Sequence, residues 1–111
     1  MASEETAEKE STVEDNQFRD YELVVIINPD LAGEALDAVV NNISQLISKK
    51  DGVITEVEQW GKKKLAYPIN HFMEGHYLLL HFKLKPELGQ ELEANLRISE
   101  EVLRHLLLRL T

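Results

Sequence analysis

Residues 21–27 (YELVVII) constrain the fold more than any other part of this chain. The stretch is rich in β-branched residues, and apolar side chains occupy both of its alternating faces. A strand with one solvated face alternates apolar and polar residues, whereas a strand inside a sheet, covered on both faces, need not. The pattern therefore predicts a central first strand of a β-sheet.

A long amphipathic helix is predicted after this strand. The residues NPD at 28–30 supply turn and capping chemistry, and apolar side chains then recur at spacings of three and four from Leu31 to Ile47. Lys49 and Lys50 follow, and Gly52 is a residue type that commonly ends a helix, so the helix is predicted to end there.

Two further strands are predicted in the middle of the chain. Residues 53–59 alternate apolar and polar side chains, as a half-buried strand does, and Gly61 interrupts them where a bulge is expected before the strand resumes through Tyr67. Pro68, Asn70 and Gly75 then bracket a connection. In the next strand one face is predicted to carry His76, Leu78, Leu80, Phe82 and Leu84, and the other Tyr77, Leu79, His81 and Lys83.

The last elements are a short helix and an ambiguous apolar run. Pro86 marks a helix start, and leucines follow at spacing four. Residues 102–110 (VLRHLLLRL) suit a helix or a strand, and we favour a strand in a chain this compact. The resulting order β-α-β-β-α-β predicts an α+β, ferredoxin-like fold: a four-stranded antiparallel sheet with two helices on one face and the other face free for binding.

Charge divides the chain into two parts. Of the net charge of −8, residues 1–17 carry −5, from six carboxylates and one lysine, with almost no apolar side chains. Such a segment cannot repay the entropy cost of ordering, so we predict a disordered acidic N-terminal tail at 1–17 and one folded domain at 18–111. There is no cysteine, no signal or transit pattern and no apolar run of about 20 residues, so a cytoplasmic protein without a membrane span is expected.

Residue patterns for catalysis or metal binding are weak. His76 and His81 have opposite parity on one strand, and no pair of carboxylates is marked out for acid–base work. Neither a phosphate-cradling glycine pattern nor a nucleophile elbow is present. We therefore predict no catalytic residues, no metal site, no cofactor and no small-molecule substrate.

Three consecutive lysines, Lys62, Lys63 and Lys64, interrupt this acidic chain between Trp60 and Tyr67. They suit contacts with a polyanion such as RNA, although lysines that protect a solvated hairpin edge would give the same pattern. The third strand lacks the aromatic residues with which RNA-recognition motifs stack on bases. Its free face would suit a packed protein partner better, or it is ordinary sheet surface.

Several motifs together resemble a known family. They are Arg19-Asp20-Tyr21-Glu22, Ile27-Asn28-Pro29, Gly61-Lys62-Lys63-Lys64-Leu65-Ala66-Tyr67-Pro68-Ile69, Gly75-His76-Tyr77 and Leu96-Arg97-Ile98. Over residues 19–110 the chain closely resembles the bacterial ribosomal protein family numbered six of the small subunit. The acidic segment before Phe18 is outside the usual core of that family.

The resemblance implies a non-enzymatic protein of the cytoplasmic ribosome. Its partners would be the central domain of small-subunit rRNA and the small-subunit ribosomal protein numbered eighteen. The implied RNA contacts are Arg19, Tyr21, Lys62, Lys63, Lys64 and Arg97. Trp60, Leu65, Tyr67, Tyr77 and Leu79 are expected to contact the partner protein.

Two other functions fit a ferredoxin-like fold. One is a small enzyme, such as an acyl-phosphate hydrolase, which would need an arginine in the loop after the first strand; residues 28–33 contain none. The other is a ligand-binding regulatory domain, which would form a stable homo-oligomer.

Overall fold

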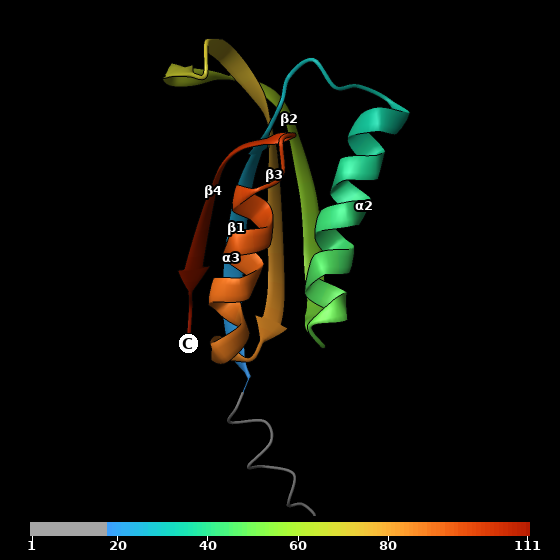
Figure 1. The fold of residues 1–111 in the computed structure, drawn as a ribbon, viewed down its shortest axis with the longest axis vertical. Coiled ribbons are helices and arrows are strands. Elements are labelled where there is room, and N and C mark those ends of the chain that lie inside the picture. The colour runs from blue at the N-terminus through green and yellow to red at the C-terminus, as the bar shows by residue number, and fades with distance from the viewer. Residues whose placement is uncertain (1–17) are drawn as a thin grey trace, which may run out of the picture.

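A computed structural model describes residues 18–111, and the predicted acidic tail at 1–17 lies outside the described residues. The elements follow in the order β1 (Arg19–Ile27), α2 (Glu34–Lys49), β2 (Val53–Ile69), β3 (Phe72–Leu84), the short 3₁₀ helix η1 (Pro86–Leu88), α3 (Gly89–Arg97) and β4 (Val102–Arg109) (Figure 1). This is the predicted β-α-β-β-α-β order.

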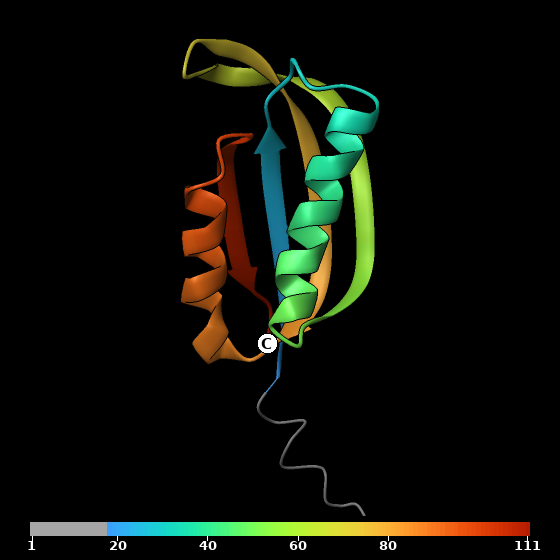
Figure 2. The same ribbon diagram turned by 45° about the vertical axis from the view of Figure 1, so that its right-hand side comes forward.

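The four strands form one antiparallel sheet in the order β2-β3-β1-β4. Both helices cover the same face of this sheet, so the opposite face, which we call the open face, carries no helix (Figure 2). Strand β1 pairs with β3 along one side and with β4 along the other, which confirms the prediction of a central first strand. The ferredoxin-like fold is confirmed.

The hydrophobic core lies between the sheet and the two helices. Alternate residues of β1, from Tyr21 to Ile27, are buried against the helices, and the amphipathic spacing of α2 and α3 turns their apolar sides inward. The rings of Tyr21 and Phe82 stack at 5.8 Å between centroids with an interplanar angle of 18°. The helices contribute Val39, Val40, Ile43, Ile47, Leu92 and Leu96 to this core.

The ambiguous leucine run at the end of the chain is a strand. β4 pairs with β1 from Tyr21↔Arg109 to Ile27↔Val102, so its backbone groups are satisfied by the sheet. Leu107 packs against the core, whereas Leu106 is exposed on the open face. Tertiary pairing therefore decides what local composition left open.

The hairpin between β2 and β3 differs from the prediction. Its connection is only two residues, Asn70 and His71, whose φ angles of 50° and 72° suit the tight turn of a two-residue hairpin. Pro68 and Gly75, predicted to bracket a loop, lie inside the two strands. The bulge predicted near Gly61 is confirmed by a register shift and a φ of 88°.

One helix boundary and the burial of one strand also differ from the prediction. Helix α2 begins at Glu34 rather than at the NPD turn, because Gly33 has a φ of 57° and ends the extended connection there. Strand β2 is an edge strand, and Val53 and Val57 are 55% and 42% exposed, so it is less buried than the alternation indicated.

Candidate RNA and partner interface

The lysine run lies where the hairpin leaves the body of the sheet. Lys62 pairs with His76, which also pairs with Ile27, the last residue of β1. Lys63 and Lys64 pair with residues further toward the tip, beyond the end of β1. Because side chains alternate along a strand, Lys62 and Lys64 lie on one face of the hairpin and Lys63 on the other.

All three lysines are exposed, and within residues 18–111 no hydrogen bond or ion pair engages their ammonium groups. Ammonium groups that form no contacts within the protein are available to bind phosphates. The hairpin of β2 and β3 extends past the end of β1 (Figure 1), and it presents three exposed cations there and at its base.

Beyond the lysines the hairpin bends toward β4. The Arg104 guanidinium donates a hydrogen bond of 3.0 Å to the Tyr67 hydroxyl, and its central carbon lies 5.8 Å from the centre of the Tyr67 ring. A shallow hollow of about 120 Å³ forms beneath the bend, lined by Ile26, Leu65, Ala66, Tyr67, Ile69, Tyr77 and Arg104. The bend therefore makes a partly apolar recess at one end of the sheet.

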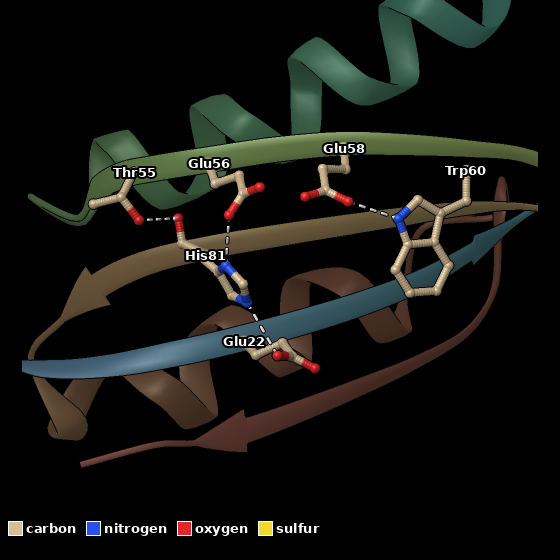
Figure 3. Close-up of polar contacts among 6 residues, drawn as sticks. All are labelled: Glu22, Thr55, Glu56, Glu58, Trp60 and His81. Atoms are coloured by element: carbon tan, nitrogen blue, oxygen red, sulfur yellow. Dashed lines mark hydrogen bonds and ion pairs between the residues drawn. The ribbon is translucent and has the colours of Figure 1, made fainter.

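A polar cluster crosses the open face near the other end (Figure 3). The two ring nitrogens of His81 on β3 lie 3.0 Å from carboxylate oxygens of Glu22 on β1 and Glu56 on β2. Hydrogen bonding to Glu22 and then to Glu56 raises the pKa of His81 above its ordinary value. The protonated ring links three adjacent strands, because only imidazolium can donate from both nitrogens.

Trp60 lies beside this cluster. Its indole N–H donates a hydrogen bond of 2.9 Å to Glu58, while 47% of the residue remains exposed (Figure 3). Hydrogen bonding with the Glu56 carboxyl group, and then with Trp60, lowers the pKa of Glu58. The open face therefore combines an exposed aromatic ring with several carboxylates.

The structure separates the predicted RNA contacts. Arg19 begins β1 at the end of the sheet opposite the lysine hairpin, and it donates a hydrogen bond of 2.9 Å to the Phe18 carbonyl oxygen. Tyr21 is only 6% exposed and belongs to the core, which argues against a direct contact of its ring with RNA. Arg97 ends α3 and is exposed at the end of the sheet from which the hairpin projects (Figure 1).

The residues predicted to contact the partner protein lie on one face of the sheet but differ in exposure. Leu65, Tyr67 and Tyr77 meet around the hollow beneath the hairpin, and Trp60 lies on the same face of the sheet nearer the carboxylates. Leu79 also points to that face but is only 7% exposed, so little of its surface is free.

Sequence reasoning missed three residues of this surface. Arg104 holds the hairpin, and Leu106 and Leu108 are 55% and 42% exposed on the open face of β4. Their shared parity in the run 102–110 was the available signal, because residues two apart on a strand point the same way.

No group of three or more histidine, aspartate or glutamate side chains suited to a metal ion occurs in residues 18–111. Neither helix of this part of the chain has the length and hydrophobicity that crossing a lipid bilayer requires.

Comparison with known proteins gives one consistent match. The family model described as ribosomal protein S6 matches residues 20–109. The small ribosomal subunit protein bS6 of Moorella thermoacetica is 49% identical over 93 residues, which cover 84% of this chain and 95% of that protein. The bS6 protein of Dehalococcoides mccartyi is 48% identical over 89 residues, covering 80% of this chain and 82% of that protein.

A solved structure agrees with these sequences. The crystal structure of 30S ribosomal protein S6 from Thermotoga maritima superimposes with a TM-score of 0.80 at 33% identity, covering 84% of this chain and 88% of that one. The strand order, the lysine hairpin and these matches lead to one conclusion: the chain belongs to the ribosomal protein S6 family of the small ribosomal subunit.

Proposed function

We propose that this chain binds the central domain of small-subunit ribosomal RNA together with the small-subunit ribosomal protein numbered eighteen, as part of the cytoplasmic ribosome. The observation that carries the proposal is the exposed lysine run on a hairpin that projects beside an acidic and partly apolar sheet face.

Family membership supplies the frame. A chain of the ribosomal protein S6 family is a structural protein of the small subunit and not an enzyme, so the alternative of a small ferredoxin-like hydrolase is excluded.

Lys62, Lys63 and Lys64 are the groups suited to phosphate. Contacts of this kind position a protein on RNA without reading its sequence, and each neutralised phosphate steepens the dependence of affinity on salt. Because Lys63 faces away from its two neighbours, the run can contact phosphates on both sides of the hairpin. Specificity must then come from RNA shape and from a second protein.

A basic protein partner suits the open face. Residues 18–111 carry a net charge of −3, so three lysines alone must hold RNA against the repulsion of the rest of the domain. Glu22, Glu56 and Glu58 lie on the open face, and exposed Trp60 and Leu106 provide apolar contact area beside them. The three carboxylates outnumber the protonated His81 ring between them, and this excess of negative charge beside an aromatic anchor favours a partner of the opposite sign.

The test is reconstitution of the chain with the eighteen-numbered protein and a transcript of the central domain. Glutamate replaces Lys62, Lys63 or Lys64 one at a time, and Lys49→Glu is the control with the same charge change. Lys49 is also exposed but lies at the end of α2, at the opposite end of the sheet from the hairpin. We expect each hairpin variant to lose about tenfold in affinity and to lower the salt slope by about one, because each loses one phosphate contact.

Partner binding has its own readout. Trp60 is the only tryptophan of the chain, so its fluorescence reports on the open face without a label. We expect a shift of its emission when the partner is added, and a weaker complex for Trp60→Ala. If the hairpin variants behave like Lys49→Glu, the lysines are not RNA ligands; if Trp60 emission is unchanged by a bound partner, the partner does not cover this part of the open face.

A further inference from the structure

We propose that the acidic segment 1–17 binds the lysine run 62–64 of the same chain and competes with RNA phosphates for it. We infer this contact from the opposite charges of the two segments, from the length of chain between them and from the exposure of the lysines. Its effect on RNA binding rests on the function proposed above. The lysine hairpin would then have two alternative polyanionic occupants, one of them covalently attached.

The segment has the composition of a competitor for phosphate. Six carboxylates and one lysine give it a net charge of −5, more than half of the net charge of −8 of the chain. The family model begins to match only at residue 20, so the segment is outside the region that this chain shares with the family model. Its acidic residues are Glu4, Glu5, Glu8, Glu10, Glu14 and Asp15.

The lysine run is the one place in residues 18–111 where three consecutive exposed cations occur. Of the cations nearer the start of β1, Lys83 forms an ion pair of 2.9 Å with Asp20, and the Lys85 ammonium lies 5.8 Å from the centre of the Phe18 ring, whereas Lys49 at the end of α2 is a single exposed cation. Lys50 is held by Asn95 at 2.9 Å. The three hairpin lysines are exposed and form no hydrogen bond or ion pair within residues 18–111, and Glu74 is the cross-strand neighbour of Lys64.

The distance that an extended chain can span divides the carboxylates of residues 1–17 into two groups. Arg19 and Lys62 are separated by the length of β1, about 27 Å, and by two strand spacings, so the straight path is roughly 30 Å. At about 3.4 Å per residue, Glu4 and Glu5 can extend roughly 45 Å from Phe18, whereas Glu14 and Asp15 can extend only about 14 Å. The distal carboxylates can contact the lysines, and the proximal pair cannot.

Tethering gives a weak contact a measurable effect. A segment joined by a short linker acts at an effective concentration in the millimolar range. If it occupies the lysines for about 70 to 90% of the time, the apparent affinity for RNA falls by about threefold to tenfold, in proportion to the free fraction. Salt of about 0.5 M should abolish this difference, because it screens exposed charges beyond a few ångströms.

The docking is tested without RNA by a zero-length carbodiimide cross-linker, which joins carboxylates to lysine amines. With the full chain at low salt we expect links from Glu4, Glu5 or Glu8 to the hairpin lysines, identified by mass spectrometry and lost at high salt. Links from the segment confined to the lysines at the other end of the sheet, Lys49, Lys83 and Lys85, would overturn the proposal.

The competition is tested with two matched variants of the full chain, each of which removes two negative charges. Glu4→Gln with Glu5→Gln removes distal carboxylates, and Glu14→Gln with Asp15→Asn removes proximal ones. We expect the distal variant to bind the central-domain transcript with its partner protein about threefold more tightly or better at low salt, and the proximal variant to match the unchanged chain. An equal gain in both variants would be an effect of net charge and would overturn the competition.

The two proposals fail in different ways. If Lys63→Glu leaves RNA affinity unchanged, the proposed function fails, while the cross-links still decide whether the segment docks. If Lys63→Glu weakens RNA binding and no segment-to-hairpin link forms, the proposed function stands and the docking is wrong.

Discussion

Tyr21 has two possible roles that a pair of substitutions separates. Its motif predicts an RNA contact, but the structure places its ring in the core, stacked on Phe82. Tyr21→Ala removes the ring, whereas Tyr21→Phe keeps the ring and removes only the hydroxyl group. A core role predicts that stability changes with the first and that RNA affinity is unchanged by the second.

The magnitude follows from burial. Tyr21 is 6% exposed, and burying a tyrosine side chain removes roughly 150 to 200 Å² from water, worth about 4 kcal/mol at 25 cal/mol per Å². Substitution of a buried aromatic residue by alanine ordinarily costs about 3 to 5 kcal/mol in the free energy of unfolding. In a domain of this size each kcal/mol lowers Tm by about 4 to 8 °C, so Tyr21→Ala should lower it by at least about 12 °C.

Urea unfolding followed by circular dichroism measures the first effect, and RNA binding with the partner protein measures the second. Tyr21→Phe should unfold within about 1 kcal/mol of the unchanged chain and bind RNA within about twofold, because the ring still fills its site. A double-mutant cycle with Phe82→Leu should give a coupling of about 0.5 to 1.5 kcal/mol for the stacked pair. The reasoning is refuted if Tyr21→Phe unfolds normally but loses about tenfold in RNA affinity.

Two further outcomes follow from the open face and the hairpin. Hydrogen bonds to Glu22 and then to Glu56 raise the pKa of His81, so the stability that this ring contributes is full below its unfolded pKa of about 6.5 and is lost as pH rises through the folded pKa. Urea unfolding should therefore show that His81→Gln loses more free energy of unfolding at pH 6 than at pH 8.5. Equal losses at the two pH values would contradict a stabilising role of the protonated ring. A Cβ atom at Gly75 would overlap Cγ2 of Ile26, so Gly75→Ala should cost about 1 to 3 kcal/mol in thermal unfolding, and a variant as stable as the unchanged chain would show that the hairpin adjusts freely.

Local pattern was sufficient for most of the fold. The apolar residues of β1 and the helical spacing of α2 are properties of short stretches, so their type could be predicted. The hairpin could not be predicted in the same way. Gly75 suggests a loop in sequence, but it is a strand residue whose missing side chain leaves room for Ile26, a residue 49 positions away on β1. That contact exists only after β1 and β3 have paired.

The candidate site likewise has one part that the sequence predicts and one part that only the structure shows. The lysine run is visible in sequence because three like charges in an acidic chain need no tertiary information. The contact between Arg104 and Tyr67 joins residues 37 positions apart and depends on how the hairpin bends beyond Gly61. The composition of the hollow beneath the hairpin therefore had to come from the structure.

The Arg19–Glu22 motif shows that adjacent residues of one motif can lie in different environments. Its adjacent residues Tyr21 and Glu22 point to opposite faces of β1: one packs under the helices, and the other binds His81 on the open face. One short motif can therefore hold both packing residues and surface residues, and strand parity separates them. Applied to the hairpin, the same parity places Lys63 opposite Lys62 and Lys64, so an RNA that contacts only one side of the hairpin would respond unequally to the three charge reversals.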